Sequence, residues 1–280
     1  MDTLNKFISP FVERAISMSK SVSNEDDEGK DFTHSLSRFT QDRKVLRDQL
    51  VSTLLAGRDT TACALSWLFY ELAYHPDVFS RLREEILSTV GKHGMPTYED
   101  LKGMKYLQWC LNESTFPYCH SKVSSPFISH CSLQRQDIIS RHHSPHWRRS
   151  QRQRSTSPTY KPTNLQPIAV AADTPVSYSA MCMQRREDLF GPTVNDFNPS
   201  RWETWTPVPW TYIPFNGGPR ICLGQNFALT EMGYATVRLL QEFGAIEERS
   251  GMERGSHGYK TDIILSPLKG VKVGLIPAKD

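Results

Sequence analysis

The stretch 214–240, PFNGGPRICLGQNFALTEMGYATVRLL, places a cysteine in a glycine-rich loop that opens directly into an apolar helix. The paired glycines allow positive φ angles and the close approach of a flat partner. Gly224 is expected to open the helix, so the sulfur of Cys222 faces unpaired helix N–H groups, which favour its thiolate form. Arg220 supplies a cation for an anionic group. An isolated cysteine in such a turn is usually a buried structural residue, so the interpretation depends on the whole spacing.

That spacing is specific. The pattern FxxGxRxCxG is matched at Phe215, Gly218, Arg220, Cys222 and Gly224. It resembles the haem-binding loop of the cytochrome P450 family. The resemblance implies that Cys222 is the axial thiolate ligand of haem (iron protoporphyrin IX), with Phe215 packed near the sulfur and Arg220 paired with a haem propionate. It also implies a fold that is mainly α with minor β, corresponding to the C-terminal part of the cytochrome P450 fold.

A long helical pattern begins at Gln41 and stops before Pro76, and it contains the string AGRDTT. A glycine, an acid and two threonines oppose helix propensity. The residues alone therefore allow a helix break capped by Asp59 or Thr60 as readily as a continuous helix. The string resembles the AGxDTT pattern of the family's distal helix. By that resemblance, Gly57 makes room for dioxygen above the haem, and Asp59 and Thr60 relay protons as catalytic residues.

Periodicity and turn signals predict the other elements. The expected segments are a helix at 1–23, an acidic linker at 24–31, a helix capped by Asp77 and ended by Gly91, a helix starting near Leu101, a strand–turn–strand at 168–181, an irregular stretch at 191–214, a helix from about Gly224 to Phe243, and a terminal hairpin of DIILSP with GVKVGLIP. No internal repeat is visible.

The chain departs from the family at Glu113. The family's ExxR motif should lie there, but Phe116 stands where its arginine belongs. NDFNPSRW resembles the short arginine motif that precedes the cysteine loop, and its arginine is Arg201. In the family, both arginines and the glutamate form a buried ion network. Removing one member costs roughly 3–5 kcal/mol, so we expect Glu113 and Arg201 to be left without their shared partner.

Residues 114–166 differ abruptly in composition from the rest of the chain. They hold 8 Lys and Arg, 11 Ser and a single acidic residue, Asp137, with no sustained apolar period. We expect this block to be disordered, and a reading-frame shift explains its sharp start best. The alternative is a genuine basic segment, in which RRSQRQRS acts as a nuclear-localisation or RNA-binding patch. Sparse aromatic residues disfavour stacking recognition, so no nucleic-acid partner is expected.

Family-like sequence is expected at 42–113 and 168–280, and more loosely at 1–41. Relative to the family, the chain is expected to lack the membrane anchor and most substrate-contacting segments. The expected divisions are a helical part at 1–113 with the distal helix and the start of the ExxR helix, the aberrant block at 114–166, and a part at 167–280 with the meander, the cysteine loop, the proximal helix and the terminal hairpin.

Composition bounds the class of protein. The chain has 280 residues, a formal net charge of +3 and a hydrophobic fraction of 38%, which suits one large domain or two ordinary ones. No apolar run reaches the roughly 18 residues of a membrane-spanning helix. The six cysteines form no CxxC pair, which argues against a zinc site or a disulfide framework and suits a reducing compartment.

The resemblance implies haem-thiolate monooxygenation, in which one oxygen atom of dioxygen enters a C–H bond of an apolar substrate. The sequence most resembles those of fungal members that oxidise alkanes and fatty acids. The resemblance implies that electrons come from an NADPH-linked flavoprotein reductase. Such enzymes lie on the cytosolic face of the endoplasmic reticulum membrane, and a chain without the anchor would be cytosolic. The competing hypothesis is an incomplete, non-catalytic fragment of such an enzyme.

Overall fold

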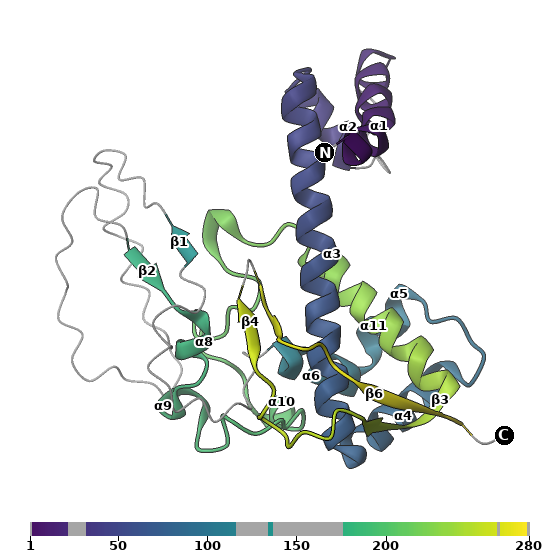
Figure 1. Cartoon of the computed structure of the whole chain (residues 1–280), viewed down its shortest axis with the longest axis vertical. Helices are drawn as coiled ribbons and strands as arrows, with labels where there is room; N and C mark the ends of the chain where they lie inside the picture. Colours follow the sequence, from purple (N-terminus) through teal and green to yellow (C-terminus); the bar gives the residue numbers. More distant parts are fainter. Residues whose placement is uncertain (1, 22–31, 116–133, 137–175, 262–263, 279–280) are drawn as a thin grey trace. The chain divides into compact units, whose positions relative to one another are not determined.

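The computed structural model describes residues 2–21, 32–115, 134–136, 176–261 and 264–278. It divides into two compact units, Met1–Ala62 and Cys63–Asp280. Helices dominate and the strands form small two-stranded sheets (Figure 1). The prediction of a mainly α fold with minor β is confirmed for these residues. In the same ranges, none of the helices combines the length and apolarity needed to cross a bilayer.

The first unit contains α1 (Asp2–Ser21), α2 (Phe32–Phe39) and the start of α3 (Arg43–Tyr74). The helix expected at 1–23 is confirmed, whereas the expected linker at 24–31 lies outside the described residues. Apolar side chains at helical spacing on α1 pack against α3. The buried members of this cluster are Ile8, Val12, Ile16 and Leu46.

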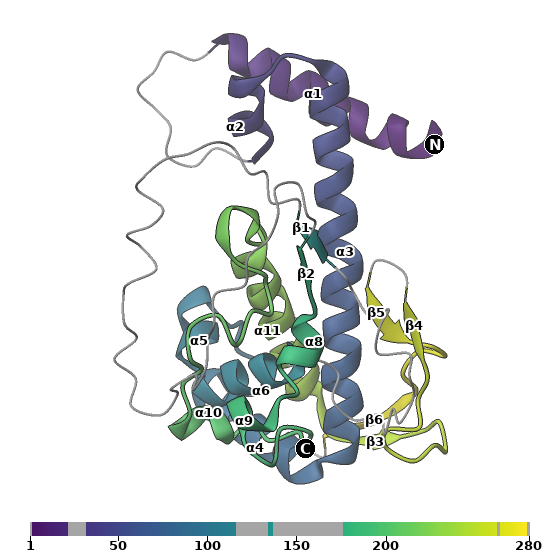
Figure 2. The same ribbon diagram turned by 90° about the vertical axis from the view of Figure 1, so that its left-hand side faces the viewer.

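Helix α3 runs unbroken through the AGRDTT string (Figure 2). Asp42 caps it, because its Oδ1 accepts hydrogen bonds from the backbone N–H groups of Lys44 at 2.8 Å and Val45 at 3.2 Å. Within the string, the Thr60 hydroxyl donates to the carbonyl of Ala56 at 2.5 Å. A hydroxyl that bonds back to the preceding turn is compatible with a helix interior. The alternative of a helix break at this string is therefore wrong.

The second unit is built on the end of α3 and on α4 (Pro76–Val90), α5 (Tyr98–Gly103), α6 (Lys105–Thr115) and α11 (Gln225–Glu242). Their apolar stripes meet in one core, because a helix with an apolar face must bury it against another element. Core residues with at most 2% exposure include Leu68, Leu72, Leu82, Ile86, Leu107, Leu111, Met232, Val237 and Leu240.

The start of α4 differs from the prediction. His75 is the N-cap residue and Pro76 is the first helical residue, a position that proline favours because its missing N–H needs no partner there. Asp77 lies in the first turn, where a negative charge interacts favourably with the helix dipole. The prediction that Asp77 caps this helix is therefore wrong. The expected end at Gly91 is confirmed, and its φ of 72° suits glycine.

The single helix expected from near Leu101 is instead two helices, α5 and α6. Thr97 caps α5 through a capping box, in which its hydroxyl accepts from the N–H of Asp100 while that carboxylate accepts from the N–H of Thr97. Met104 has an extended backbone and separates the two helices. The prediction erred because the apolar period continues across this turn and buries Leu101 and Met104 together.

The chain's last strands pair with earlier segments. The terminal hairpin prediction is wrong, because DIILSP and GVKVGLIP do not pair with each other. Gly270, the first residue of GVKVGLIP, has a φ of +70°, and the final strand joins the strand that follows α11. The antiparallel pairs are β3 (Phe243–Glu248) with β6 (Val273–Pro277), and β4 (Tyr259–Thr261) with β5 (Leu265–Pro267).

The block 114–166 is described at two places. Ser114 and Thr115 end α6, with Ser114 buried, and β1 (Gln134–Gln136) pairs antiparallel with β2 (Val176–Tyr178). The expectation of disorder throughout the block is wrong at these two places. Its other residues lie outside the described ranges, so the expectation stays a prediction for them.

Three short helices lie between β2 and the cysteine loop. They are α8 (Ala180–Met183), α9 (Glu187–Phe190) and α10 (Arg201–Thr204). The strand–turn–strand expected at 168–181 is confirmed at β2, whereas its end forms α8 and its start lies outside the described residues. The stretch expected to be irregular contains α10, which carries Arg201 toward the end of α6.

A buried ion pair joins the end of α3 to the turn before β4. Arg254 Nε lies 3.0 Å from Glu71 Oε2, and the Glu71 side chain is 8% exposed. Beside it, the N–H of Gly255 donates to the Tyr70 hydroxyl at 2.7 Å. Burial raises the pKa of Glu71 to about 7, and the opposing effect of Arg254 does not cancel it. Between pH 4.5 and about pH 7, the folded protein therefore holds a proton on Glu71 that the unfolded chain releases. Above about pH 7, the Glu71 carboxylate is ionised and forms the ion pair with Arg254.

Substituting Glu71→Gln should change the pH dependence of stability. A carboxyl whose folded pKa is raised contributes stability that is complete below pH 4.5 and is lost as the pH rises to about 7. Between these values the free energy of unfolding should fall by about 3 kcal/mol more in the parent than in the variant. Urea denaturation at several pH values measures this, with the exposed Glu247→Gln as the control. Parallel curves for parent and Glu71→Gln would contradict the prediction.

Candidate functional site

The cysteine loop closes on its own backbone immediately before α11. The N–H of Cys222 donates to the carbonyl of Phe215 at 2.9 Å. Between these residues, Gly218–Arg220 form the short 3-10 helix η2, and Gly218 has a φ of +71°. Gly224 is the N-cap of α11, as predicted. The five residues of the FxxGxRxCxG pattern therefore share one turn at the start of one helix.

Two neighbouring positions explain the shape of the loop. Asn216 has a φ of 64°, unusual for a residue with a side chain. The Tyr178 hydroxyl donates to its side-chain oxygen and holds it there. A Cβ atom on Gly217 would lie 2.5 Å from the indole ring of Trp210, so a side chain at this position would displace that ring. The loop depends on contacts that the five-residue pattern does not include.

The sulfur of Cys222 lies at the surface. Cys222 is exposed, whereas Cys63 and Cys110 are buried, so the interpretation of Cys222 as a buried structural cysteine is wrong. Large apolar side chains around it are exposed as well, which is uncommon for residues of their size. Their exposed fractions are 50% for Ile221, 77% for Leu223 and 71% for Phe227.

These features fit a haem. An exposed thiol at a helix N-terminus suits a thiolate ligand, and the exposed apolar side chains suit a flat apolar ring. No atom lies within 4 Å of a Cβ placed on Gly218, so a ligand has open space there. Arg220 is exposed and supplies a cation. Among the residues that the structure describes, no cluster of three or more His, Cys, Asp or Glu side chains is placed to hold a metal ion.

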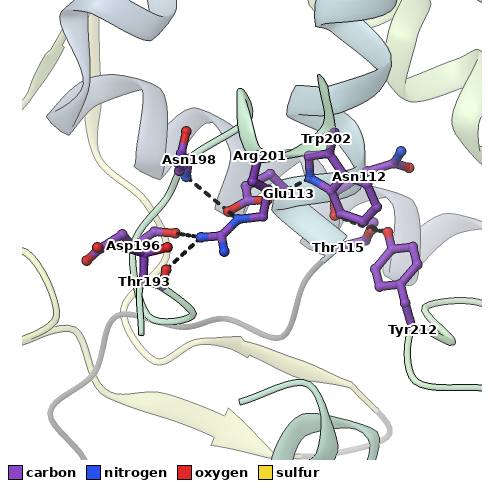
Figure 3. A network of polar contacts seen from close by, with 9 residues as sticks. All are labelled: Asn112, Glu113, Thr115, Thr193, Asp196, Asn198, Arg201, Trp202 and Tyr212. Carbon is purple, nitrogen blue, oxygen red and sulfur yellow. Dashed lines mark hydrogen bonds and ion pairs between the residues drawn. The ribbon is translucent and has the colours of Figure 1, made fainter. Parts of the chain in front are cut away.

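The second part of the site is a buried carboxylate network around Glu113 (Figure 3). Its Oε1 accepts hydrogen bonds from Arg201 Nε and from the backbone N–H of Asn198, each at 3.0 Å. Its Oε2 accepts from the indole N–H of Trp202 at 2.7 Å. The side chains of Glu113 and Arg201 are 2% and 8% exposed. Both carboxylate oxygens are thus satisfied by residues at or beside α10.

The arginine expected as a shared partner is absent from position 116, but Glu113 and Arg201 are not left without contacts. They pair with each other, and the indole of Trp202 adds a donor. Arg201 Nη2 also donates to the carbonyls of Thr193 at 2.6 Å and Asp196 at 2.8 Å. Burial still raises the pKa of Glu113 to about 6, against the lowering effect of Arg201. Sequence reasoning missed Trp202, although it directly follows Arg201 in the recognised motif.

Helix α6, which carries Glu113, is also fixed at its other end. Both oxygens of Glu85, on α4, accept hydrogen bonds from the first N–H groups of α6, those of Tyr106 and Leu107, at 2.8 Å each. A carboxylate at a helix N-terminus is favoured by the unpaired N–H groups and by the helix dipole. The position of Glu113 is thus set by contacts at both ends of a short helix.

Asp59 and Thr60 lie on α3 in the first unit, and both are exposed. Asp59 pairs with Arg58, whose guanidinium lowers the pKa of the Asp59 carboxyl by a hydrogen bond of 2.6 Å. The Thr60 hydroxyl bonds to Ala56 within the helix. A Cβ placed on Gly57 meets no atom within 4 Å. The proton relay assigned to Asp59 and Thr60 stays a prediction.

A sequence model of the cytochrome P450 family matches residues 1–115 and 141–269. The match includes residues 1–41, resumes at residue 141 rather than near 168, and ends at residue 269 rather than 280. The second matched range therefore includes residues 141–166 of the block, and the expected division of the chain at 166 stays a prediction. The expected break just after Glu113 is consistent with the end of the first matched range.

Curated relatives come from fungi. Cytochrome P450 monooxygenase pvhE of Talaromyces variabilis is 39% identical over 283 residues, covering 98% of this chain and 48% of the relative. Cytochrome P450 52A13 of Debaryomyces hansenii is 38% identical over 244 residues, covering 85% of the chain and 43% of the relative. Cytochrome P450 52A4 of Candida maltosa is 39% identical, covering 88% and 43%. The chain thus spans less than half the length of these three relatives.

Substituting Arg201→Met should lower the free energy of unfolding by about 3–5 kcal/mol, because it leaves the buried carboxylate of Glu113 without its cation. Arg249→Met breaks an exposed pair with Glu247 and should cost no more than about 1 kcal/mol. Chemical denaturation at neutral pH measures both variants. Equal losses would show that the Glu113 network behaves as a surface ion pair.

Proposed function

The chain belongs to the cytochrome P450 family, and we propose from this that it carries the haem-binding part of a haem-thiolate monooxygenase. The observation that carries the proposal is the exposed sulfur of Cys222, set in the FxxGxRxCxG loop at the start of α11. When bound, a haem with a thiolate ligand supplies the activation of dioxygen and the insertion of one oxygen atom into a C–H bond.

In this proposal, the residues of the loop bind and orient the haem. Cys222 provides the thiolate, which the N-terminal N–H groups of α11 stabilise. Arg220 pairs with a propionate, and Phe215 packs beside the sulfur. The exposed side chains of Leu223 and Phe227 cover part of the apolar ring and exclude water from it. The roles of Cys222, Arg220 and Phe215 follow from the resemblance of the loop to that of the family, and the chemistry of each side chain is compatible with its role.

The substrate and the electron donor belong to the same proposal. The sequence resemblance supports an apolar small molecule, of the alkane or fatty-acid class, as substrate. It supports an NADPH-linked flavoprotein reductase as the source of electrons and the cytosolic face of the endoplasmic reticulum membrane as the location. Asp59 and Thr60 then hold and pass the protons that dioxygen reduction consumes, because a carboxyl and a hydroxyl one residue apart can exchange protons with water.

A second candidate is a non-catalytic member of the family. The observation that favours it is Phe116, which stands at the position of the ExxR arginine. The Glu113 network nevertheless forms with Arg201 and Trp202 as donors, which supports a loop that still binds haem. The spectrum of the protein with haem and the rate of product formation separate the two candidates.

Substituting Cys222→Ala should abolish the thiolate-type absorption of the reduced, CO-bound protein, because alanine offers iron no ligand. Cys182→Ala is the matched control, since Cys182 is partly exposed but lies outside the loop. It should leave the absorption unchanged. A thiolate-type spectrum that survives in Cys222→Ala would refute the assignment of the ligand.

Substituting Thr60→Ala should uncouple electron consumption from product formation if Thr60 passes protons. In a chain completed to the length of its relatives and supplied with a reductase, NADPH consumption should continue while hydrogen peroxide replaces most of the product. Thr53→Ala is the matched control, because Thr53 lies on α3 and makes the same bond to the carbonyl four residues earlier. If both variants keep the coupling of the parent, Thr60 has no part in the relay.

A further inference from the structure

The segment that leads into the cysteine loop is tied to the core by aromatic residues. Trp202 packs against Trp205 and Tyr212, with ring centroids 5.1 and 4.8 Å apart and edge-to-face geometry. These rings join Phe190 and Val194 in a small apolar cluster. Aromatic pairs in this geometry are favourable beyond the area that they bury. Of these residues, Trp205 and Tyr212 lie on the chain between α10 and Phe215, where the loop begins.

Trp202 also contacts the buried charge directly. Its indole N–H donates to Glu113 Oε2 at 2.7 Å, while Arg201 and a backbone N–H serve Oε1. A hydrogen bond to an ionised group is shorter and stronger than one between neutral groups. Removing this donor would leave one oxygen of a buried carboxylate poorly satisfied, which costs more than the bond itself contributes. The indole therefore fixes α10 to the end of α6 through the carboxylate.

Tyr212 extends the connection toward the loop. Its hydroxyl donates to the carbonyl of Asn112 at 3.1 Å and bonds to the Thr115 hydroxyl at 2.9 Å (Figure 3). Both partners are on α6, on either side of Glu113. Three residues after Tyr212, the carbonyl of Phe215 accepts the N–H of Cys222. The hydroxyl of Tyr212 thus bonds to the residues beside Glu113, and three residues of chain connect Tyr212 to the carbonyl that holds the backbone of the proposed ligand.

We propose that Trp202 and Tyr212 are positioning residues for Cys222, which hold the cysteine loop to the end of α6 through the Glu113 carboxylate and the adjacent backbone. The inference rests on the proposed function, because it assigns Cys222 as the haem ligand. In this proposal, the indole N–H of Trp202 is a donor to Glu113 in a network that lacks an arginine at position 116. The effect of both residues is on the place and rigidity of the loop.

Three variants separate hydrogen bonding from packing. Trp202→Phe keeps an aromatic ring but removes the N–H donor. Trp202→His keeps a ring N–H at a corresponding position but removes the second ring. Tyr212→Phe removes the hydroxyl alone. The matched control is Trp109→Phe, since Trp109 is also partly buried, lies on α6 and packs edge-to-face against Tyr106 at 6.0 Å.

The first measurement is hydrogen exchange of the Cys222 amide in the whole chain without added haem. Trp202→Phe and Tyr212→Phe should each raise its exchange rate about tenfold relative to Trp109→Phe, because each removes a hydrogen bond at a buried site. In Trp202→His, the exchange rate of the Cys222 amide should stay within about threefold of the parent rate, because this variant retains the ring N–H donor. Exchange in Trp202→His as fast as in Trp202→Phe, or equal rates in Trp109→Phe and Trp202→Phe, would overturn the proposal.

The second measurement is the absorption of the reduced, CO-bound chain after haem is added. The thiolate-type fraction should fall at least about threefold in Trp202→Phe and recover in Trp202→His, in step with amide exchange. A parent spectrum that does not depend on Cys222 would refute the proposed function, and amide exchange would still decide whether these residues position the loop. A Cys222-dependent spectrum that is unchanged in Trp202→Phe would refute the positioning role and leave the proposed function intact.

Discussion

A buried carboxylate sets the arrangement of the second unit. Glu113 is 2% exposed at its side chain, and a charge removed from water is costly unless donors surround it. Its donors come from the guanidinium of Arg201, the indole of Trp202 and a backbone N–H at Asn198, all far along the chain. Because the buried carboxylate of Glu113 requires these donors, the segment before the cysteine loop packs at the end of α6. The network still forms with Phe116 at the position of the second arginine.

Local signals in the sequence predict the four longest helices that the structure describes. The apolar period and the cap residues define α1, α3, α4 and α11 to within a few residues. The split between α5 and α6 was missed although the Thr97–Asp100 capping box is a short-range signal, because the apolar period continues across it. The pairing of β6 with β3 was missed for another reason. Strand partners distant in the chain are chosen by packing on the core, here by the buried Ile246, and no local pattern encodes that choice.

The residues of the candidate site also differ in whether local sequence predicts them. The cysteine loop is encoded within a few residues, so Phe215, Gly218, Arg220 and Gly224 were recognised together with Cys222. Trp202 and Tyr212 were not assigned, because their partners lie about 90 to 100 residues earlier in the chain. Aromatic residues in a stretch that reads as irregular carry no periodic signal. Their contribution lies in long-range contacts with α6.

The contact between Gly217 and Trp210 bears on how this loop varies among relatives. A side chain at position 217 would displace an indole at position 210 from the place that it has here, since the Cβ would lie 2.5 Å from the ring. The two positions should therefore covary: homologues with a larger residue at 217 should carry a small or differently oriented one at 210. Relatives that carry both Trp at position 210 and Gly at position 217 would then form a subgroup of the family in which the loop has the same shape.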